Sequence, residues 1–363
     1  SCRADRTISD RRGARFMISP RLLAIARCPS CRTELYAADE RLTCRACDRR
    51  YAAVGGDYLD LRPATPFAEM TKYVDEAMYE EGRHDRVSPP LLSAAIRNDM
   101  LRQFLQVTPD DRVIDLGCGS GRALVWNRDS GANLAGIDVS PHFAVEALAS
   151  VDLMVGDLRQ LPVADRSFTK AFTLDVLEHL SRDALMQMLK ETARVLEPGG
   201  HLFVYTHVRK NSPVAAGLRV INRLARGLER LGLVDLTHER LRKSDHVNPL
   251  ADIPDLERVV EEAGFRIDRI RYYTPLVGGF VENILLRMAE RWATRRAESA
   301  ADDAAPVPRA AVRAAHQRAQ ARLAKRGFTY GMLVALTWLM KIDLVLFGRI
   351  RSGPFFALLT RTA

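Results

Sequence analysis

Short apolar runs alternate with helical patterns between residues 111 and 207 of this 363-residue chain. Such alternation is typical of βαβ units, which build a mostly parallel sheet covered by helices. The predicted strands are 112–116, 133–138, 153–156, 170–174 and 200–206, followed by further candidates at 265–273 and 354–360. The pattern predicts an α/β fold, in which ligands bind beyond the carboxyl ends of the strands.

The strand-and-helix block lies between segments of different composition. We predict a disordered or non-native tail at 1–16 and a small cysteine-containing unit at 17–63. The core is expected at 64–275, with a helical insertion at 209–245. Residues 276–363 are expected to form Ala/Arg/Glu-rich helices, an apolar helix and the final strand.

Two segments outside the core have unusual predicted surfaces. A helix over 214–233 places four arginines on one face. Residues 328–340 form an apolar run, which is too short to span a bilayer and whose extension is interrupted by Lys341 and Asp343. A buried helix or an interfacial helix is expected there. A basic face beside an interfacial apolar helix would fit peripheral contact with an anionic membrane.

Composition narrows the class of protein. With 47% hydrophobic and 27% charged residues, the chain can build a sizeable core, which excludes a wholly disordered chain, a collagen and a coiled-coil rod. A mean hydropathy of −0.14 excludes a polytopic membrane protein. The net charge of +9 favours nucleic acid, anionic lipid or acidic substrates as partners without choosing among them.

Four of the six cysteines form two CxxC pairs, Cys28 with Cys31 and Cys44 with Cys47. Two such pairs can place four thiolates tetrahedrally around one Zn²⁺, which leaves no open coordination position. The predicted zinc is therefore structural. Residues 1–16 lack an apolar leader, so a reducing, cytoplasmic compartment is expected, where redox-active or free thiols are the alternative interpretation.

A glycine-rich turn follows the first predicted strand, where residues 113–122 read VIDLGCGSGR. Glycines allow the backbone to approach a ligand that a Cβ atom would displace. Asp138 follows Gly117 by 21 residues and ends the next strand, where its carboxylate can accept both ribose hydroxyls. The GxGxG spacing with Asp115 just before it favours a cofactor with a positively charged amino-acid end over a dinucleotide.

Five motifs occur in order along the core: DLGCGSG at 115–121, GIDVS at 136–140, GDL at 156–158, DVLEHL at 175–180 and RVLEPGG at 194–200. Together they resemble class I S-adenosylmethionine-dependent methyltransferases of the broad small-molecule type. Residues 22–61 resemble the zinc ribbons of the methyltransferase-activator type. The resemblance implies a Rossmann-like, seven-stranded methyltransferase sheet with a small N-terminal zinc ribbon and helical insertions.

The resemblance also implies where S-adenosylmethionine binds. The methionine part lies at the glycine turn, the ribose at the end of the second strand, the adenine after the second and third strands, and the sulfonium at the end of the fourth. The resemblance places the methionine part at Asp115, Gly117, Gly119 and Gly121, and the ribose at Asp138. It places the adenine at Val139, Asp157 and Leu158, and the sulfonium at Leu174 and Asp175. Asp157 and Asp175 could instead cap helices.

Candidate catalytic residues are histidines. Methyl transfer from a sulfonium depends mainly on orientation and exclusion of water, and a general base is optional. His246, His179 and His207 could each take a proton from an acceptor hydroxyl. Each could equally cap a strand or a helix. His246 is favoured, because it precedes a helix expected to border the acceptor.

Three functions compete at this stage. The leading hypothesis is methylation of a small or lipid-like molecule by an enzyme. The second is an RNA methyltransferase whose zinc ribbon binds the nucleic acid, although no RNA-binding platform is evident. The third is a non-catalytic methyltransferase fold that acts as an interaction module. Intact cofactor motifs argue against the third.

Overall fold

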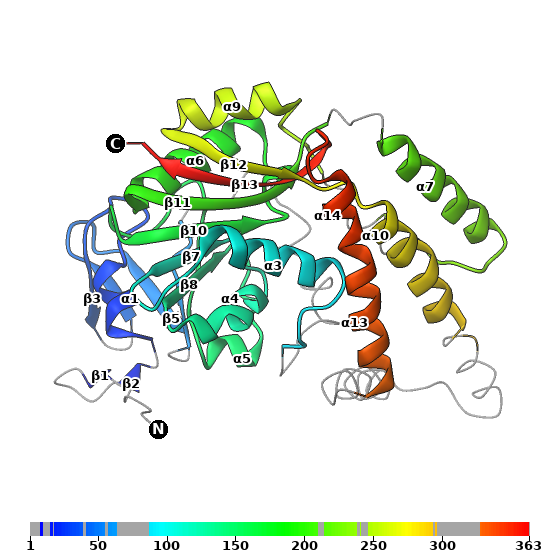
Figure 1. Ribbon diagram of the computed structural model, residues 1–363. Coiled ribbons are helices and arrows are strands. Elements are labelled where there is room, and N and C mark those ends of the chain that lie inside the picture. Colours follow the sequence, from blue (N-terminus) through cyan, green and yellow to red (C-terminus); the bar gives the residue numbers. More distant parts are fainter. Residues whose placement is uncertain are drawn as a thin grey trace, which may run out of the picture.

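One large sheet organises the molecule (Figure 1). The computed structural model describes residues 8–9, 15–16, 18–38, 41–54, 57–63, 87–209, 214–237, 240, 246–292, 295 and 327–362. Seven strands of the sheet run in the order β9-β8-β7-β10-β11-β13-β12. They are β7 (Arg112–Leu116), β8 (Asn133–Asp138), β9 (Asp152–Val155), β10 (Phe168–Leu174), β11 (Leu196–His207), β12 (Phe265–Tyr272) and β13 (Pro354–Arg361).

The strand directions confirm the predicted α/β class and the seven-stranded sheet. β7 pairs in parallel with β8 and β10, and β11 continues in parallel with β10. β13 is antiparallel to both β11 and β12. The carboxyl ends of β7, β8, β9, β10 and β11 therefore lie along one edge, where the predicted site residues follow the strands.

Helices cover both faces of the sheet and form two cores. One face packs against α6 (Arg182–Val195) and α9 (Ile253–Glu262), and the other against α3 (Ser93–Leu105), α4 (Arg122–Asn127) and α5 (Val145–Leu148) (Figure 1). Alternate residues of each strand supply the two cores, as the twofold period of a strand requires. In β11, for example, Leu202 and Val204 face one core and Phe203 the other.

The cysteine-containing unit extends the same sheet. Its elements are α1 (Pro20–Ile25), β3 (Leu35–Ala38), β4 (Arg41–Cys44), β5 (Arg50–Val54) and β6 (Tyr58–Asp60). β3, β4, β5 and β6 are antiparallel, and β6 pairs in parallel with β9, with Leu59 opposite Met154. The result is an eleven-stranded sheet. This continuity was not predicted, because the sequence pattern separates the two units.

A group of helices stands at one end of the sheet, beyond α3. They are α7 (Ala215–Arg230), α10 (Leu276–Phe280), the π-helix η4 (Val281–Leu286), α13 (Phe328–Met340) and α14 (Ile342–Phe347). In Figure 1 α7, α10 and α13 lie side by side at the right of the molecule. α7 packs on η4 through the buried Ala225 and Ile284. Of the Ala/Arg/Glu-rich helices expected within 276–363, residues 293–294 and 296–326 lie outside the described residues.

The apolar run differs from expectation. α13 and α14 together cover Phe328–Phe347, 20 residues that are long and apolar enough, by length and composition, to cross a membrane. The predicted apolar run ended too early, because the helical segment continues past two polar residues that have partners in the protein: Lys341 contacts Asp99 at 2.7 Å, and Asp343 accepts from the backbone N–H groups of Val277 and Gly278. Of the two predicted alternatives, the buried helix is contradicted, since only 17% of the most apolar window is buried, and the interfacial helix stays a prediction.

The N-terminal segment contains two short strands. β1 (Ile8–Ser9) and β2 (Arg15–Phe16) form a short antiparallel pair within the segment predicted to be disordered or non-native. The rest of 1–16 lies outside the described residues.

Candidate functional site

The glycine turn joins β7 to α4 and lies at the carboxyl edge of the sheet. Gly117, Gly119 and Gly121 all have positive φ angles, of 82°, 53° and 79°. A Cβ atom on Gly117 would lie 2.5 Å from Val176 Cγ2, and one on Gly121 would lie 2.7 Å from Ala147 Cβ. A Cβ on Gly119 would meet no protein atom within 4 Å. Gly117 and Gly121 are thus needed for packing, whereas Gly119 leaves space for a ligand.

Two buried carboxylates flank this turn. Asp138, at the end of β8, accepts hydrogen bonds from the backbone N–H of Gly119 at 2.7 Å and of Ser140 at 3.1 Å. Asp115, in β7, is 2% exposed, and burial together with the Asp138 charge raises its pKa well above the usual value. Burial also raises the pKa of Asp138. A positively charged ligand group would stabilise both carboxylates.

The residues expected at the adenine lie at the ends of β8 and β9. The two strand ends are joined by a hydrogen bond from Gly156 N–H to the Asp138 carbonyl, at 2.9 Å. Val139 and Leu158 are half-buried there. Asp157 accepts from the backbone N–H of Arg159 at 2.8 Å and forms an ion pair with its guanidinium at 3.0 Å. Part of its hydrogen-bonding capacity is therefore already used.

The end of β10 holds Asp175 in a strained conformation beside a cation. Leu174 ends the strand, and Asp175 has a φ of 57°, with its N–H donating to the Tyr205 carbonyl at 3.1 Å. Arg97, from α3, lies 3.4 Å from the Asp175 carboxylate and stacks over the Tyr205 ring. Neither Arg97 nor Tyr205 was predicted, because a single arginine in an amphipathic helix carries no sequence signal.

The three candidate histidines come together around a buried glutamate. His179 and His246 are in edge-to-face contact, with ring centroids 4.7 Å apart, and the His207 and His246 centroids are 5.5 Å apart. Glu178 is 2% exposed, and its carboxylate lies 3.9 Å from His207 Nδ1. Burial, and then the Asp175 charge, raises the Glu178 pKa to about 8. The three histidines were predicted as candidates, whereas Glu178 was not, although Glu178 directly precedes His179 in the sequence.

The four predicted cysteine ligands also come together. The Sγ atoms of Cys31 lie 3.3 Å from Cys44 and 3.8 Å from Cys47, and Cys28 lies 3.7 Å from Cys47. A tetrahedral zinc with Zn–S bonds of about 2.3 Å needs sulfurs separated by about 3.8 Å. The cluster therefore fits one zinc ion.

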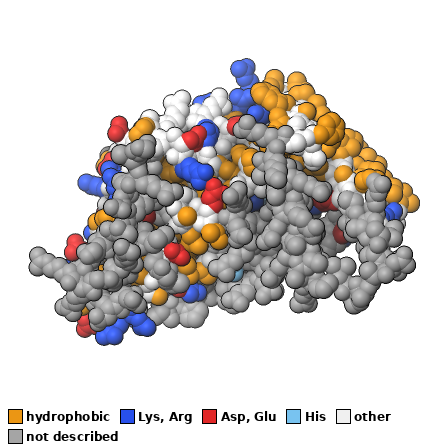
Figure 2. Space-filling model, turned by 90° about the horizontal axis from the view of Figure 1, so that it is seen from below, with side chains coloured by type: hydrophobic (Ala, Val, Ile, Leu, Met, Phe, Trp, Pro, Cys, Tyr) orange, Lys and Arg blue, Asp and Glu red, His pale blue; other side chains and the backbone are white. Residues whose placement is uncertain are grey.

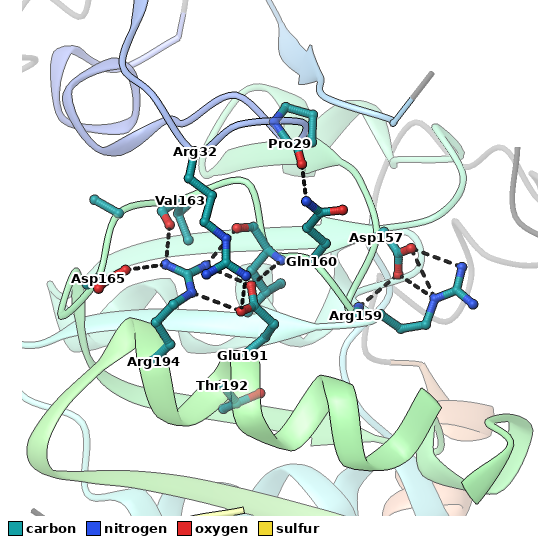
Figure 3. A network of polar contacts seen from close by, with 12 residues as sticks. Pro29, Arg32, Asp157, Arg159, Gln160, Val163, Asp165, Glu191, Thr192 and Arg194 are labelled. Atoms are coloured by element: carbon teal, nitrogen blue, oxygen red, sulfur yellow. Dashed lines mark hydrogen bonds and ion pairs between the residues drawn. The ribbon is translucent and has the colours of Figure 1, made fainter. Parts of the chain in front are cut away.

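A polar network joins the cysteine unit to the loop after β9 (Figure 3). Gln160 donates to the Pro29 carbonyl, and Arg32 pairs with Glu191 of α6 at 2.9 Å. Glu191 also accepts from the backbone N–H of Leu161 at 2.9 Å and from Arg194 at 2.8 Å. The unit thus contacts the segment that begins with Asp157.

Comparison with known families agrees with this geometry. Residues 114–204, which hold the glycine turn and Asp138, match the family model described as a methyltransferase domain. The chain carries an S-adenosylmethionine-dependent methyltransferase domain. Residues 19–55, with all four cysteine ligands, match the model described as Trm112p-like protein. The methyltransferase domain and its Trm112p-like ribbon confirm the family resemblance seen in the motifs.

Curated relatives match parts of the chain. "Probable tRNA methyltransferase 9B" of Mus musculus is 36% identical over 108 residues, which cover 29% of this chain and 24% of the relative. Methyltransferase GfsG of Streptomyces halstedii is 34% identical over 129 residues, which cover 32% of this chain and 45% of the relative. Sterol 4-C-methyltransferase strm-1 of Caenorhabditis elegans is 25% identical over 171 residues, which cover 43% of this chain and 50% of the relative. The chain thus spans half or less of these relatives.

Among solved structures, phosphoethanolamine N-methyltransferase 2 of Haemonchus contortus, in complex with S-adenosyl-L-methionine, aligns with a TM-score of 0.46 and 17% identity. The alignment covers 82% of this chain and 62% of that one.

Proposed function

We propose that the protein transfers a methyl group from S-adenosylmethionine to a small apolar or lipid-like acceptor at the surface of an anionic membrane. The observation that most directly supports methyl transfer is the space for a ligand at Gly119, beside the Asp138 carboxylate. A ligand placed there would lie along the same edge of the sheet as Asp175 and the histidine cluster. We also propose a cytoplasmic location, where the cysteine ligands stay reduced.

Different residues along this edge of the sheet would bind the cofactor and accept the proton. Asp115, the glycine turn and Asp138 would hold the methionine and ribose parts, and Leu158 and Val139 would contact the adenine. S-adenosylmethionine, when bound, supplies a methyl group on a sulfonium, whose C–S bonding pair returns to sulfur as the acceptor lone pair attacks. A histidine of the cluster takes the acceptor proton, which His207 can do beside Glu178.

The apolar acceptor is inferred from the helices at the end of the sheet. Phe328 is 90% exposed, Trp338 67% and Val345 77%, all on α13 and α14. Figure 2 shows hydrophobic side chains gathered at this end of the molecule. Further exposed apolar residues on α7, on η4 and in the residues that directly follow these helices are Val220, Leu224, Leu231, Leu285, Met288 and Trp292. A surface of this extent is unusual for a protein that contacts water alone.

The charge of this end of the molecule supports an anionic membrane as the partner of the apolar face. Four exposed arginines lie along α7 at helical spacing: Arg219, Arg223, Arg226 and Arg230. Lys341 lies 4.4 Å from the centre of the Trp338 ring, a pair suited to the headgroup level of a membrane. α13 contacts α3 through Thr337, which accepts from the Leu92 N–H at 2.8 Å, so the apolar face begins next to the helix that carries Arg97.

Liposome flotation tests the membrane contact. The protein should float with anionic vesicles at low salt, float less at high salt, and not float with neutral vesicles, because the arginines supply much of the attraction. Trp338→Glu combined with Val345→Glu should abolish flotation. Tyr36→Glu, at an exposed aromatic residue of the ribbon, is the matched control and should float like the parent.

The outcomes separate the alternatives. Equal flotation of Trp338→Glu/Val345→Glu and of the parent would rule out this face as the contact. Binding to vesicles that persists after alkaline carbonate extraction would replace peripheral contact by a membrane-spanning α13–α14. Absence of flotation under every condition would leave a methyltransferase of water-soluble acceptors.

RNA is the second candidate acceptor, and two similarities favour it. The Mus musculus relative is named as a tRNA methyltransferase, and the ribbon is Trm112p-like. Incubation with methyl-labelled S-adenosylmethionine and either total lipid extract or total RNA should label the lipid fraction. The Asp138→Ala variant is the control for background. Label found only in the RNA fraction would identify RNA as the acceptor in place of a lipid. If neither fraction is labelled and the protein does not bind S-adenosylmethionine, a non-catalytic interaction module is favoured.

A further inference from the structure

A glutamate and two histidines form a compact group that no part of the cofactor site requires. One ligand-capable atom from each of Glu178, His179 and His246 lies within 4.8 Å of the others. Two imidazoles and one carboxylate are a ligand set that proteins use for first-row divalent metals. We propose that these three residues bind a divalent transition-metal cation, in a second metal site separate from the cysteine cluster.

The backbone holds the three ligands together although they come from distant segments. The N–H groups of Val247 and Asn248 both donate to the Glu178 carbonyl, at 2.8 and 2.9 Å. Arg182, at the start of α6, donates to the Pro249 carbonyl at 3.3 Å and pairs with Asp255 of α9 at 2.8 Å. The turn that carries His246 is therefore fixed to the segment that carries Glu178 and His179 before any ligand binds.

Hydrogen bonds outside the group orient its carboxylate. Thr206 Oγ1 donates to Glu178 Oε2 at 2.9 Å, and the other oxygen, Oε1, faces the histidines, 3.9 Å from His207 Nδ1. Metal-binding carboxylates are typically oriented by such a bond on the second oxygen. Within the described residues, Asn248 Oδ1 is buried without a hydrogen-bond partner, in the turn that is bonded to Glu178. It is a further oxygen that a hydrated cation could contact.

The cation would have a role in methyl transfer. Three protein ligands leave coordination positions open, so an acceptor oxygen could bind the cation and lose its proton more easily. His207 lies beside the group and outside the ligand set, and it would take that proton. This role rests on the proposed function, whereas binding of the cation does not.

Cobalt binding tests the site on the full, untagged chain purified with zinc on its cysteines. After addition of Co²⁺ and removal of the free metal, elemental analysis should find one Co²⁺ per chain in addition to one zinc. Its absorption should lack the intense thiolate charge-transfer bands of cobalt bound to cysteine. His179→Ala/His246→Ala should lose the cobalt and keep the zinc. Glu178→Gln, a smaller change, should weaken cobalt binding at least tenfold.

His201→Ala is the matched control, because His201 lies in the first half of β11, away from the carboxyl edge, and contacts Thr360. It should bind cobalt like the parent. The proposal is overturned if the parent binds no cobalt beyond the cysteine site, or if the double variant, folded by circular dichroism, binds as much as His201→Ala. Calorimetric titration with S-adenosylmethionine separates the two proposals, since cofactor binding without cobalt binding would remove the metal site alone.

Discussion

Loss of the cysteine-bound metal should weaken S-adenosylmethionine binding at a distance from the cysteines. In Cys44→Ser, zinc is lost and the ribbon unfolds, because metal binding and folding of so small a unit are coupled. The methyltransferase sheet should stay folded. Cofactor affinity should nevertheless fall by roughly one to two powers of ten, the equivalent of about 1–3 kcal/mol of lost positioning contacts.

The physical reason is the junction between the two units. β6 lies against β9, and Leu59 of β6 is fully buried there. Gln160 and Glu191 lose their partners Pro29 and Arg32 when the ribbon unfolds. Each of these contacts supports the segment after β9, whose first residues are Asp157 and Leu158. We therefore expect the ribbon to support the end of the site where the adenine is proposed to bind.

Calorimetric titration of S-adenosylmethionine into the parent, Cys44→Ser and Arg41→Ala measures this coupling. Arg41 is an exposed residue of β4, outside the zinc ligands and the junction, and its variant should bind zinc and cofactor like the parent. Arg32→Ala should keep the zinc and show a smaller loss of cofactor affinity. Unchanged affinity in zinc-free Cys44→Ser would show that the ribbon and the cofactor site are energetically independent.

The strands, and the places of the proposed cofactor residues at their ends, could be predicted because their signals are local. β7 and β8 begin and end where the apolar runs do, and the glycine turn and Asp138 belong to motifs within a few residues of these strands. The four cysteines are similarly specified by their spacing. Local periodicity and spacing are the information that a single sequence carries most strongly.

Features that depend on contacts between distant segments could not be predicted. The pairing of β6 with β9 joins residues about 95 apart, and Arg97 reaches Asp175 from a separate helix. Glu178 was missed because a carboxylate in a helical motif is usually a surface residue. The extent of the apolar segment α13–α14 was underestimated because Asp343 was taken to end it, whereas the backbone N–H groups of Val277 and Gly278 donate to its carboxylate.

Asp138→Ala should weaken S-adenosylmethionine binding by roughly 2–3 kcal/mol, or about 30- to 150-fold, on the scale of hydrogen bonds to a charged group. The carboxylate has two roles in this structure. It holds the glycine turn through the Gly119 N–H, and it stands where ribose hydroxyls would bind. Asp138→Asn keeps an oxygen for the Gly119 bond and should lose less affinity than Asp138→Ala. Parent-like binding by Asp138→Ala would place the cofactor away from the end of β8.

Gly119→Val should abolish cofactor binding altogether while leaving most of the fold intact. The Cβ atom of the new side chain would meet no protein atom within 4 Å, so we expect the side chain to occupy the space left for the ligand. The φ of 53° costs the variant about 1–2 kcal/mol of stability. Gly121→Val is the matched comparison: its Cβ would lie 2.7 Å from Ala147 Cβ, so it should unfold at a distinctly lower temperature. Calorimetric titration and thermal unfolding of both variants separate the two effects. If Gly119→Val binds S-adenosylmethionine, the space at residue 119 does not belong to the cofactor.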